Sequence, residues 1–313
     1  MIITESTRQA FGDELLVLGE EVDNLYVIDA DVGKSMKTVP FQQKFPEKHV
    51  NVGIAEQNCA GVAAGLATMG KLPIISTYAV FGSMRMLEQI RQSICYTKLN
   101  VKIACSHGGL TPANDGGSHQ GIEDMGILRT IPGMTVMMGA DYNSTRKLLR
   151  EMVKSHVGPA YIRFTREATP GIYDEDERFE IGVAKQLREG NDVTIIAVGD
   201  VLILALKAAK ILEEKGIKAR VLDMHTIKPL DQGAVLKALR ETKGIITVED
   251  HNIINGLGSA VSEVVCENNG GIVYRIGILD KFGESGPYEV LLKENGISVD
   301  NIIAKAEKIV KGE

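Results

Sequence analysis

The chain has 313 residues and a mass of 33.9 kDa, which is more than one hydrophobic core usually supports, so we expect two compact domains. Its hydrophobic fraction of 44% and charged fraction of 24% are those of a globular protein and argue against a disordered or fibrous chain. The net charge of −6 argues against a basic surface for nucleic acid or for an anionic membrane.

The four cysteines form no C-x-x-C pair, so neither a zinc site nor a dithiol motif is indicated. No apolar run is long enough to span a bilayer, and the first residues lack the apolar core of a signal peptide. We therefore expect a cytoplasmic protein that binds neither nucleic acid nor membrane.

Short β-branched runs alternate with helical patterns along the first half of the chain. The expected strands cover residues 25–29, 72–77, 100–105, 134–138 and 160–164. The expected helices cover residues 5–18, 56–69, 84–96 and 143–154. This alternation predicts an α/β fold with a mostly parallel sheet that helices cover on both faces.

A charged segment at 171–190 follows, and we expect it to connect two domains, 1–170 and 191–313. After this segment the strand and helix pattern restarts. The expected strands cover 193–198, 219–223, 244–249 and 272–276, and the expected helices cover 202–215, 232–240, 258–267 and about 300–310. The second half is therefore predicted to be a smaller α/β domain.

Several familiar motifs are incomplete. Gly33-Lys-Ser35 resembles the end of a phosphate-binding P-loop, but Ile28 stands where that motif needs a glycine. Gly256-Leu-Gly258 lacks the third glycine of a dinucleotide fingerprint, so we favour a helix N-terminus packed against a strand. The histidines lack metal-ligand spacing, and no G-x-S-x-G elbow is present.

An acidic residue, Glu56, opens a helical segment made largely of Ala and Gly. It could simply complement the dipole at the start of the helix, where acids are enriched. Alternatively, a carboxyl group held in a tightly packed apolar interface would have a raised pKa and could share a proton with a ligand nitrogen. The residue alone does not decide between these two interpretations.

A glycine-rich loop at 107–120 follows an expected strand and contains His107, Asp115 and His119. Long loops at the carboxyl ends of parallel strands are where α/β sheets bind ligands. A solvated turn is the alternative, but it fits less well because ionisable residues are interleaved with Gly and Pro. We therefore predict that this loop is functional.

Together these segments resemble the carboxyl-terminal half of transketolase in order and in spacing. The resemblance runs from Arg8 to the end of the chain and implies a thiamine pyrimidine-binding domain followed by the small transketolase C-terminal domain. The residues that carry it are Glu56 in Gly-Ile-Ala-Glu-Gln, Tyr78 and Phe81 in Ser-Thr-Tyr-Ala-Val-Phe, and the loop with His107, Asp115 and His119-Gln.

The resemblance also implies an activity, a cofactor and a partner. Transketolase moves a two-carbon ketol unit from a ketose phosphate to an aldose phosphate, a reaction of the pentose phosphate pathway, with thiamine diphosphate as the electron sink. Its relatives hold the diphosphate through Mg²⁺ with a G-D-G motif, which this chain lacks. We therefore expect an amino-terminal transketolase subunit that carries the Mg²⁺ ligands, in a heterotetramer of a split enzyme.

The cofactor residues follow from matching positions. The resemblance implies that Glu56 hydrogen-bonds the pyrimidine and is catalytic, that Phe81 stacks on that ring, and that Tyr78 lines the pocket; plain core packing is the alternative for the two aromatic residues. Asp31 would hold its loop or contact the cofactor, with a solvated turn acid as the alternative. Met84 stands where the family has a tyrosine contact, so this part of the pocket is expected to differ because Met donates no hydrogen bond.

The substrate residues are implied in the same way. His119, as a second catalytic residue, and Asp115 would contact sugar hydroxyls, and His107 would lie near the phosphate-bearing end. A guanidinium suits phosphate because it gives paired, charge-assisted hydrogen bonds. The alternatives are that Arg8 is a solvated helix residue and that Arg166 is a cation at the end of a strand. The remaining phosphate ligands would be Arg8, Ser35 and Arg166.

The second half offers Asp223-Met-His225 and Glu249-Asp-His251, which also resemble the family, and for these we expect a structural role. Three other functions stay open. Deoxyxylulose-5-phosphate synthase shares Gly-Ile-Ala-Glu-Gln but normally has Asp where His107 stands. The beta chain of a 2-oxoacid dehydrogenase has this length and also needs a partner, and a non-catalytic assembly subunit is the third.

Overall fold

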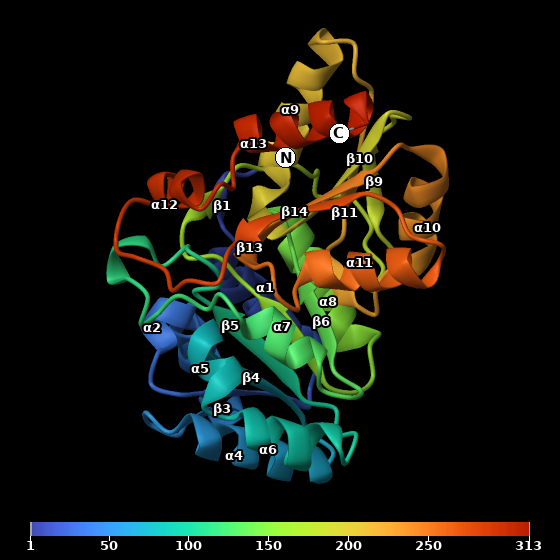
Figure 1. Cartoon of the computed structure of the whole chain (residues 1–313). Helices are drawn as coiled ribbons and strands as arrows, with labels where there is room; N and C mark the ends of the chain where they lie inside the picture. Colours follow the sequence, from blue (N-terminus) through green and yellow to red (C-terminus); the bar gives the residue numbers. More distant parts are fainter. Residues whose placement is uncertain (1, 313) are drawn as a thin grey trace.

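The first half of the chain builds most of a seven-stranded sheet in a computed structural model that describes residues 2–312 (Figure 1). Six parallel strands pair in the order β6-β7-β5-β4-β2-β3. Their carboxyl ends share one edge, where α/β sheets bind ligands. The strands are β2 (Leu25–Asp29), β3 (His49–Asn51), β4 (Leu72–Tyr78), β5 (Lys102–Ser106), β6 (Thr135–Met138) and β7 (Ala160–Arg163).

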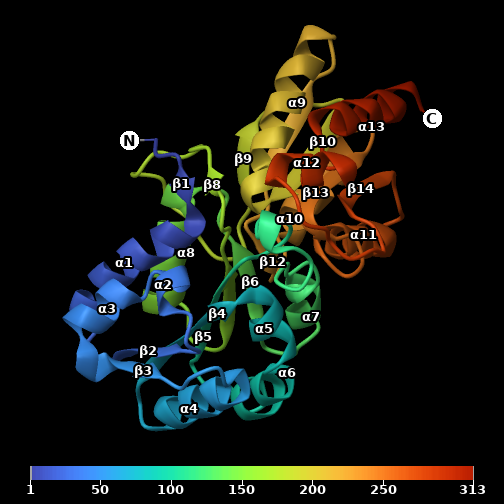
Figure 2. The same ribbon diagram turned by 90° about the vertical axis from the view of Figure 1, so that its left-hand side faces the viewer.

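Helices cover both faces of this sheet (Figure 2). Adjacent strand residues supply the two cores in turn: Ile74 packs with α1 and α8, and Ile75 packs with α4 and α7, because successive side chains of a strand point to opposite faces. These helices are α1 (Thr7–Glu21), α8 (Tyr142–Lys154), α4 (Glu56–Thr68) and α7 (Asp124–Arg129). Shorter helices follow the strand ends: α2 (Gly33–Met36), α3 (Val39–Lys44), α5 (Ala79–Met84) and α6 (Leu87–Gln89).

The second half forms a five-stranded sheet of order β14-β13-β10-β11-β9, in which β9 alone is antiparallel within the described chain. Its strands are β9 (Lys185–Arg188), β10 (Val193–Val198), β11 (Ala219–Asp223), β13 (Ile245–Asn252) and β14 (Val273–Ile278). One face carries α9 and α13 and the other carries α10 and α11. These helices are α9 (Leu202–Glu214), α13 (Val299–Lys311), α10 (Gln232–Glu241) and α11 (Leu257–Glu267).

Short elements join the two halves. β12 (Thr226–Lys228) comes from the second half but pairs antiparallel with β6, so it completes the first sheet. Lys228 Nζ then donates hydrogen bonds to the carbonyl oxygens of Arg129 at 2.8 Å and Ile131 at 2.5 Å, at the end of α7. The other connecting elements are α12 (Tyr288–Glu294) and the antiparallel pair β1 (Glu5–Ser6) and β8 (Ala168–Thr169).

The predicted α/β fold, with a mostly parallel larger sheet and a second smaller α/β domain, is confirmed. The helix predicted over 84–96 is confirmed only in part: α5 ends at Met84, and the helical residues that follow are α6 and a π-helix at Ile90–Cys95. The sequence did not indicate β3, β9 or β12, since three or four residues show too little alternation; β9 lies inside the segment predicted to connect the domains. No helix in residues 2–312 is long and apolar enough to cross a membrane.

Candidate active site

A cavity of about 360 Å³ opens at the carboxyl edge of the larger sheet. Its walls come from the ends of β2, β3 and β4 and from α2, which is the position expected for a ligand site in a parallel sheet. Three residues predicted for the site share this cavity. The lining includes Asp31, Ser35 and Tyr78, and also Asp29, His49 and Asn51, which no sequence motif had indicated.

Asp29 anchors the floor of this cavity. Its carboxylate accepts hydrogen bonds from Thr38 Oγ1 at 2.5 Å and from the backbone N–H of Val32 at 2.8 Å, and burial raises its pKa. Asp31 lies above it with φ of +65° and accepts a hydrogen bond from Asn51 Nδ2 at 3.1 Å. That contact is typical of a residue that holds its loop; contact of Asp31 with a cofactor stays a prediction.

Glu56 is the first residue of α4, and its side chain is 7% exposed. Arg85 Nη1 donates a hydrogen bond to Glu56 Oε1 at 2.9 Å, and within residues 2–312 no hydrogen bond reaches Oε2. The carboxyl group is buried, which agrees with the second of the two interpretations, but its surroundings are not purely apolar because Arg85 supplies a cation. A cavity of about 520 Å³ opens beside it, lined by Glu56, Arg85 and residues such as Ile54.

Arg85 joins Glu56 to the aromatic side of the site. Its guanidinium lies 4.1 Å from the centre of the Phe81 ring, while the same group donates to Glu56. Arg85 does not stand out in the sequence. The one available signal is its position four residues after Phe81, which places the two side chains on one side of a helical turn.

Four rings meet where β4 ends. The Tyr78 ring centre lies 3.9 Å from that of His107 and 6.0 Å from that of His119. Phe81 lies 5.8 Å from Tyr78 and 5.7 Å from His119, again between ring centres. The fold therefore brings the two predicted aromatic residues together with both histidines of the 107–120 loop.

His107 is buried and takes a left-handed backbone conformation, with φ of +64°. Its Nδ1 lies 2.7 Å from Ser106 Oγ. Burial, with smaller effects from Arg8, Arg166 and His119, lowers its pKa to about 3. His107 is therefore a neutral hydrogen-bonding group at neutral pH.

Two arginines stand near this histidine. Arg8 Nη1 donates a hydrogen bond to Ser35 Oγ at 3.1 Å, and burial together with the nearby charge of Arg166 lowers the pKa of Arg8. Arg166 Nη1 donates to the carbonyl oxygen of Pro112 at 2.6 Å and lies 2.9 Å from Asp115 Oδ2. Two cations close enough to interact would both gain from a bound anion.

The remaining predicted residues lie at the open side of the site. Asp115 is exposed and paired with Arg166, and His119 is half-buried with Nδ1 3.0 Å from Ser118 Oγ. Met84, at the end of α5, is 39% exposed. Within residues 2–312 no group of three or more His, Cys, Asp or Glu side chains could hold a metal ion.

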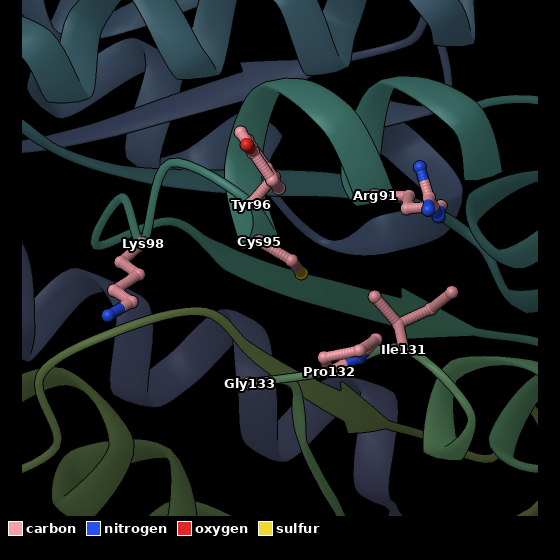
Figure 3. Close-up of a pocket in the computed structure, with 7 residues that line it drawn as sticks. All are labelled: Arg91, Cys95, Tyr96, Lys98, Ile131, Pro132 and Gly133. Atoms are coloured by element: carbon pink, nitrogen blue, oxygen red, sulfur yellow. The ribbon is translucent and has the colours of Figure 1, made fainter.

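A further cavity, of about 340 Å³, lies at the opposite edge of the sheet (Figure 3). It is formed where the chain enters β5 and β6, so it faces the amino ends of the strands. Its lining is mainly apolar and contains none of the predicted site residues: Arg91, Cys95, Tyr96, Lys98, Ile131, Pro132 and Gly133. The carboxyl-edge cavity is therefore the better candidate for catalysis.

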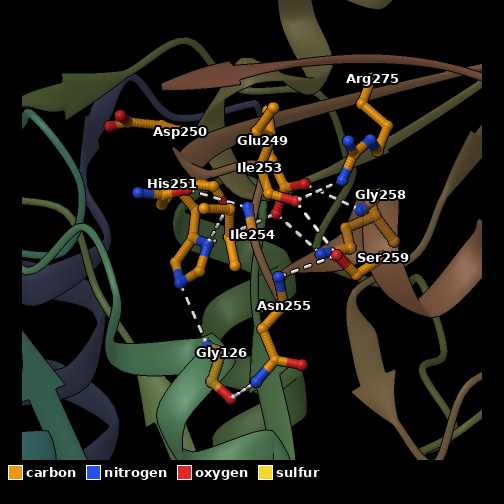
Figure 4. A network of polar contacts seen from close by, with 12 residues as sticks. Gly126, Glu249, Asp250, His251, Ile253, Ile254, Asn255, Gly258, Ser259 and Arg275 are labelled. Atoms are coloured by element: carbon orange, nitrogen blue, oxygen red, sulfur yellow. Dashed lines mark hydrogen bonds and ion pairs between the residues drawn. The ribbon is translucent and has the colours of Figure 1, made fainter. Parts of the chain in front are cut away.

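Polar contacts also join the two domains, around Glu249 and His251 (Figure 4). His251 Nε2 accepts a hydrogen bond from the backbone N–H of Gly126 at 3.1 Å. Glu249 accepts hydrogen bonds from the backbone N–H groups of Leu257 at 2.7 Å and Gly258 at 2.8 Å, at the start of α11, and burial raises its pKa to about 7. These contacts agree with the structural role expected for this motif and with a helix N-terminus packed against a strand.

Comparisons with known proteins agree with this geometry. Residues 4–171 match the family model of the transketolase pyrimidine binding domain, and residues 182–302 match that of the transketolase C-terminal domain. The chain is 43% identical to a Methanocaldococcus jannaschii protein that carries the name of a transketolase C-terminal section, over 99% of this chain and 98% of that protein. It is also similar to a solved structure described as an inactive β4 tetramer of a split-gene transketolase, with a TM-score of 0.89, 43% identity and 98% coverage of both chains.

Two other relatives show the range of reactions among similar proteins. A 6-deoxy-6-sulfo-D-fructose transketolase subunit of a Clostridium species is 39% identical over 97% of this chain and 94% of its own length. A 1-deoxy-D-xylulose-5-phosphate synthase of Geobacter sulfurreducens is 40% identical over 95% of this chain but only 47% of its own length.

Proposed function

The chain belongs to the transketolase family, and on that basis we propose that it is the short, carboxyl-terminal subunit of a split transketolase. Its reaction would be the transfer of a two-carbon ketol unit from a ketose phosphate to an aldose phosphate. One observation carries the proposal: a buried carboxyl group, an aromatic pair, two histidines and two arginines converge at the carboxyl edge of the larger sheet. The match to a relative named as a transketolase C-terminal section, over 99% of this chain and 98% of that protein, supports the split.

The transketolase family depends on thiamine diphosphate, and the residues around Glu56 suit its pyrimidine ring. Thiamine diphosphate, when bound, supplies the electron sink that a carbanion next to a carbonyl group needs. Glu56 would hold a proton against the ring nitrogen through Oε2, since Arg85 occupies Oε1. Phe81 and Tyr78 would line the ring's pocket, with the aromatic faces available for stacking.

Mg²⁺ and the diphosphate would be held by a partner chain, the amino-terminal subunit, in a heterotetramer. The absence of a G-D-G motif from this sequence and the split-gene relatives support this part of the proposal. The same proposal includes two domains, at residues 1–170 and 191–313, with a connection at 171–190. It also includes a cytoplasmic location and a place in the pentose phosphate pathway.

The substrate's phosphate would bind between Arg8, Arg166, Ser35 and His107. A neutral His107 can hydrogen-bond the anion without adding repulsion to the two neighbouring arginines. Asp115 and His119, at the open side, would contact the sugar hydroxyls. Because Asp115 is paired with Arg166 in the free chain, a phosphate that takes Arg166 would release the carboxylate for this contact.

A deoxyxylulose-5-phosphate synthase-like reaction is the second candidate, favoured by 40% identity to such an enzyme. The test is to purify the chain with its candidate partner, add thiamine diphosphate and Mg²⁺, and assay xylulose 5-phosphate with ribose 5-phosphate. Transfer of the two-carbon unit supports the proposal. Consumption of pyruvate instead favours a synthase or a 2-oxoacid dehydrogenase beta chain, turnover by this chain alone rules out the split subunit, and no turnover with any substrate favours an assembly subunit.

A further inference from the structure

The loop that carries His107, Asp115 and His119 is held from outside by the second domain. The backbone N–H of Leu110 lies 3.1 and 2.9 Å from the two carboxylate oxygens of Asp250. Asp250 is a buried residue of β13, in the second sheet. The loop's conformation is thus tied to a side chain 140 residues further along the chain.

The loop backbone lies too close to this carboxylate to carry side chains there. A Cβ atom added at Gly109 would lie 2.1 Å from Asp250 Oδ2, and one added at Gly108 would lie 1.8 Å from Arg163 Nε. Gly109 also has φ of +61°, which favours glycine. The two glycines therefore allow the loop to lie directly on Asp250 and Arg163.

The residue before these glycines, His107, is under backbone strain. A non-glycine residue with φ of +64° persists only when its surroundings fix it, and such strain concentrates at functional sites. Two backbone hydrogen bonds join the ends of the loop: Gly109 N–H donates to Gly121 O at 2.7 Å, and Gly121 N–H donates to His107 O at 3.2 Å. The Asp250 carboxylate, which accepts the Leu110 N–H, fixes the backbone between these two hydrogen bonds.

Asp250 is itself fixed by buried groups of both domains. Arg163 Nη2 donates a hydrogen bond to the Asp250 carbonyl oxygen at 2.5 Å. Tyr288 OH donates to Asp200 and lies 3.1 Å from Asp250 Oδ2. Arg163 also lies 3.4 Å from Asp124 Oδ1, and its charge interacts with the buried carboxyl groups of Asp124, Asp250 and Asp200. In this buried cluster the hydrogen bonds to Asp250 are stronger than they would be in water, because the surroundings have a low dielectric constant.

The second domain reaches the other end of the loop as well. Gln120 Nε2 donates a hydrogen bond to the carbonyl oxygen of Glu284 at 2.9 Å, and Ser285 Oγ donates to that of Asn114 at 2.7 Å. Glu284 and Ser285 belong to the connection between β14 and α12. The loop is therefore supported near both of its ends by the domain in which the sequence indicated no functional residue.

We propose that the second domain positions the candidate active-site loop, and that Asp250 is the positioning residue that keeps His107 against Tyr78. Asp250 is buried and lines neither cavity of the candidate site; it acts through the Leu110 amide and the Gly108–Gly109 backbone. Its effect on catalysis rests on the function proposed above, whereas its effect on the loop does not.

The test uses hydrogen–deuterium exchange of the full chain, followed at peptides that cover residues 107–120. Tyr288→Phe removes the hydroxyl that lies between the Asp200 and Asp250 carboxyl groups, and Asp250→Ala removes the acceptor of the Leu110 amide. Exchange of the Leu110 amide should become about tenfold faster in each, the change expected for the loss of one hydrogen bond. Asp250→Asn keeps one acceptor oxygen. In this variant the Leu110 amide should therefore exchange more slowly than in Asp250→Ala and faster than in the wild type.

Tyr173→Phe is the matched control. Tyr173 OH donates to the buried carboxylate of Asp223 at 2.7 Å, so this variant also removes a phenol hydroxyl bound to a second-domain aspartate, but it leaves the loop untouched. Both tyrosine variants should lower the melting temperature. Tyr173→Phe, unlike Tyr288→Phe, should leave exchange at residues 107–120 unchanged. In the assembled enzyme, kcat/KM should fall about tenfold in Tyr288→Phe and stay at the wild-type value in Tyr173→Phe.

The possible outcomes separate the two proposals. Unchanged Leu110 exchange in both Tyr288→Phe and Asp250→Ala, or equal acceleration in Tyr173→Phe, overturns the positioning role. If Asp250→Ala does not fold, the Tyr288→Phe and Tyr173→Phe comparison still decides. An assembled wild-type enzyme without transketolase activity contradicts the proposed function, while the exchange result continues to report on the loop.

Discussion

Arg85 donates a hydrogen bond to Glu56 across 2.9 Å and stacks on Phe81 with the same guanidinium group. The carboxyl group at the start of α4 and the aromatic side chain of Phe81 in α5 are thus joined by one cation. Arg85 is half-exposed, whereas Glu56 is buried. The hydrogen bond from Arg85 therefore fixes the orientation of the buried Glu56 carboxylate. Arg85 itself is accessible to solvent or to a neighbouring chain.

Replacing Glu56 with Gln should abolish proton exchange with the cofactor while leaving the fold intact. We expect turnover of the assembled enzyme to fall by about 10²-fold to 10⁴-fold, the range for loss of a general acid–base group. The free energy of unfolding should change by less than about 1 kcal/mol, because the abandoned Arg85 side chain is half-exposed and stays solvated. Steady-state kinetics and urea unfolding check the two parts.

The control for this variant is Glu307→Gln. Glu307 also pairs with a cation, Lys215, but it lies on α13 of the second domain. Its replacement should leave turnover unchanged. Near-normal turnover of Glu56→Gln with partner and cofactor present would show that the carboxyl group has only a helix-dipole role.

Replacing Arg166 with Ala should weaken the binding of phosphorylated substrates. The variant loses a guanidinium that can give charge-assisted hydrogen bonds, and we expect KM to rise about tenfold or more. Arg188→Ala is the matched control, since Arg188 pairs with Glu213 on the second domain, away from the site. An unchanged KM in Arg166→Ala would mean that Arg166 does not bind the phosphate.

Lys102 gives a pH-dependent contribution to stability. It is fully buried, donates hydrogen bonds to the carbonyl oxygens of His156 and Gly158 at 2.9 Å each, and has a pKa lowered by burial to about 7. Between pH 7 and 10.5 the unfolded chain therefore binds more protons than the folded chain, so this residue makes stability rise with pH across that window.

The corresponding variant is Lys102→Met. Its free energy of unfolding, measured against pH and subtracted from that of the wild type, should isolate the contribution of this lysine. The difference in favour of the wild type should grow from pH 7 towards pH 10. A difference that stays constant over this range would contradict a lowered pKa for Lys102.

The four cysteines should differ sharply in reactivity. Cys59, Cys95 and Cys105 are buried, and burial raises the pKa of each thiol, to about 11 for Cys95. Cys266 is exposed on α11. A soluble thiol reagent should therefore modify one cysteine rapidly in the folded chain, because the thiolate is the reactive form and needs access. Cys266→Ser should remove this rapid phase, and a second rapid thiol would contradict the burial of the other three.

Strong local patterns in the sequence predicted the fold well. β2 at Leu25–Asp29 and β10 at Val193–Val198 have the predicted bounds, because dense β-branched runs flanked by polar residues identify buried strands. The π-helix at Ile90–Cys95 shows where this reasoning fails. Its apolar residues fit an ordinary helical pattern, so the periodicity alone gives no sign of the wider turn.

The candidate site could be predicted only as far as residue types and order allow. The loop with His107 and His119 stands out because ionisable residues alternate with glycines. Arg85 and Asp250 do not stand out, since each depends on a contact that tertiary structure creates: Arg85 reaches back to Glu56, and Asp250 reaches across to Leu110. Neither partner is near in sequence, and no local pattern encodes such pairs.

The crossing of β12 from the second half into the first sheet limits how the chain can be divided. A fragment that ends at residue 190 would lack β12, and Thr135–Met138 would then become an uncovered edge strand. Its free N–H and C=O groups would offer a template for pairing with other chains, which is how exposed edges cause aggregation. Separating the two halves would therefore expose an edge of the first sheet to pairing with other chains, whatever chemistry the halves perform together.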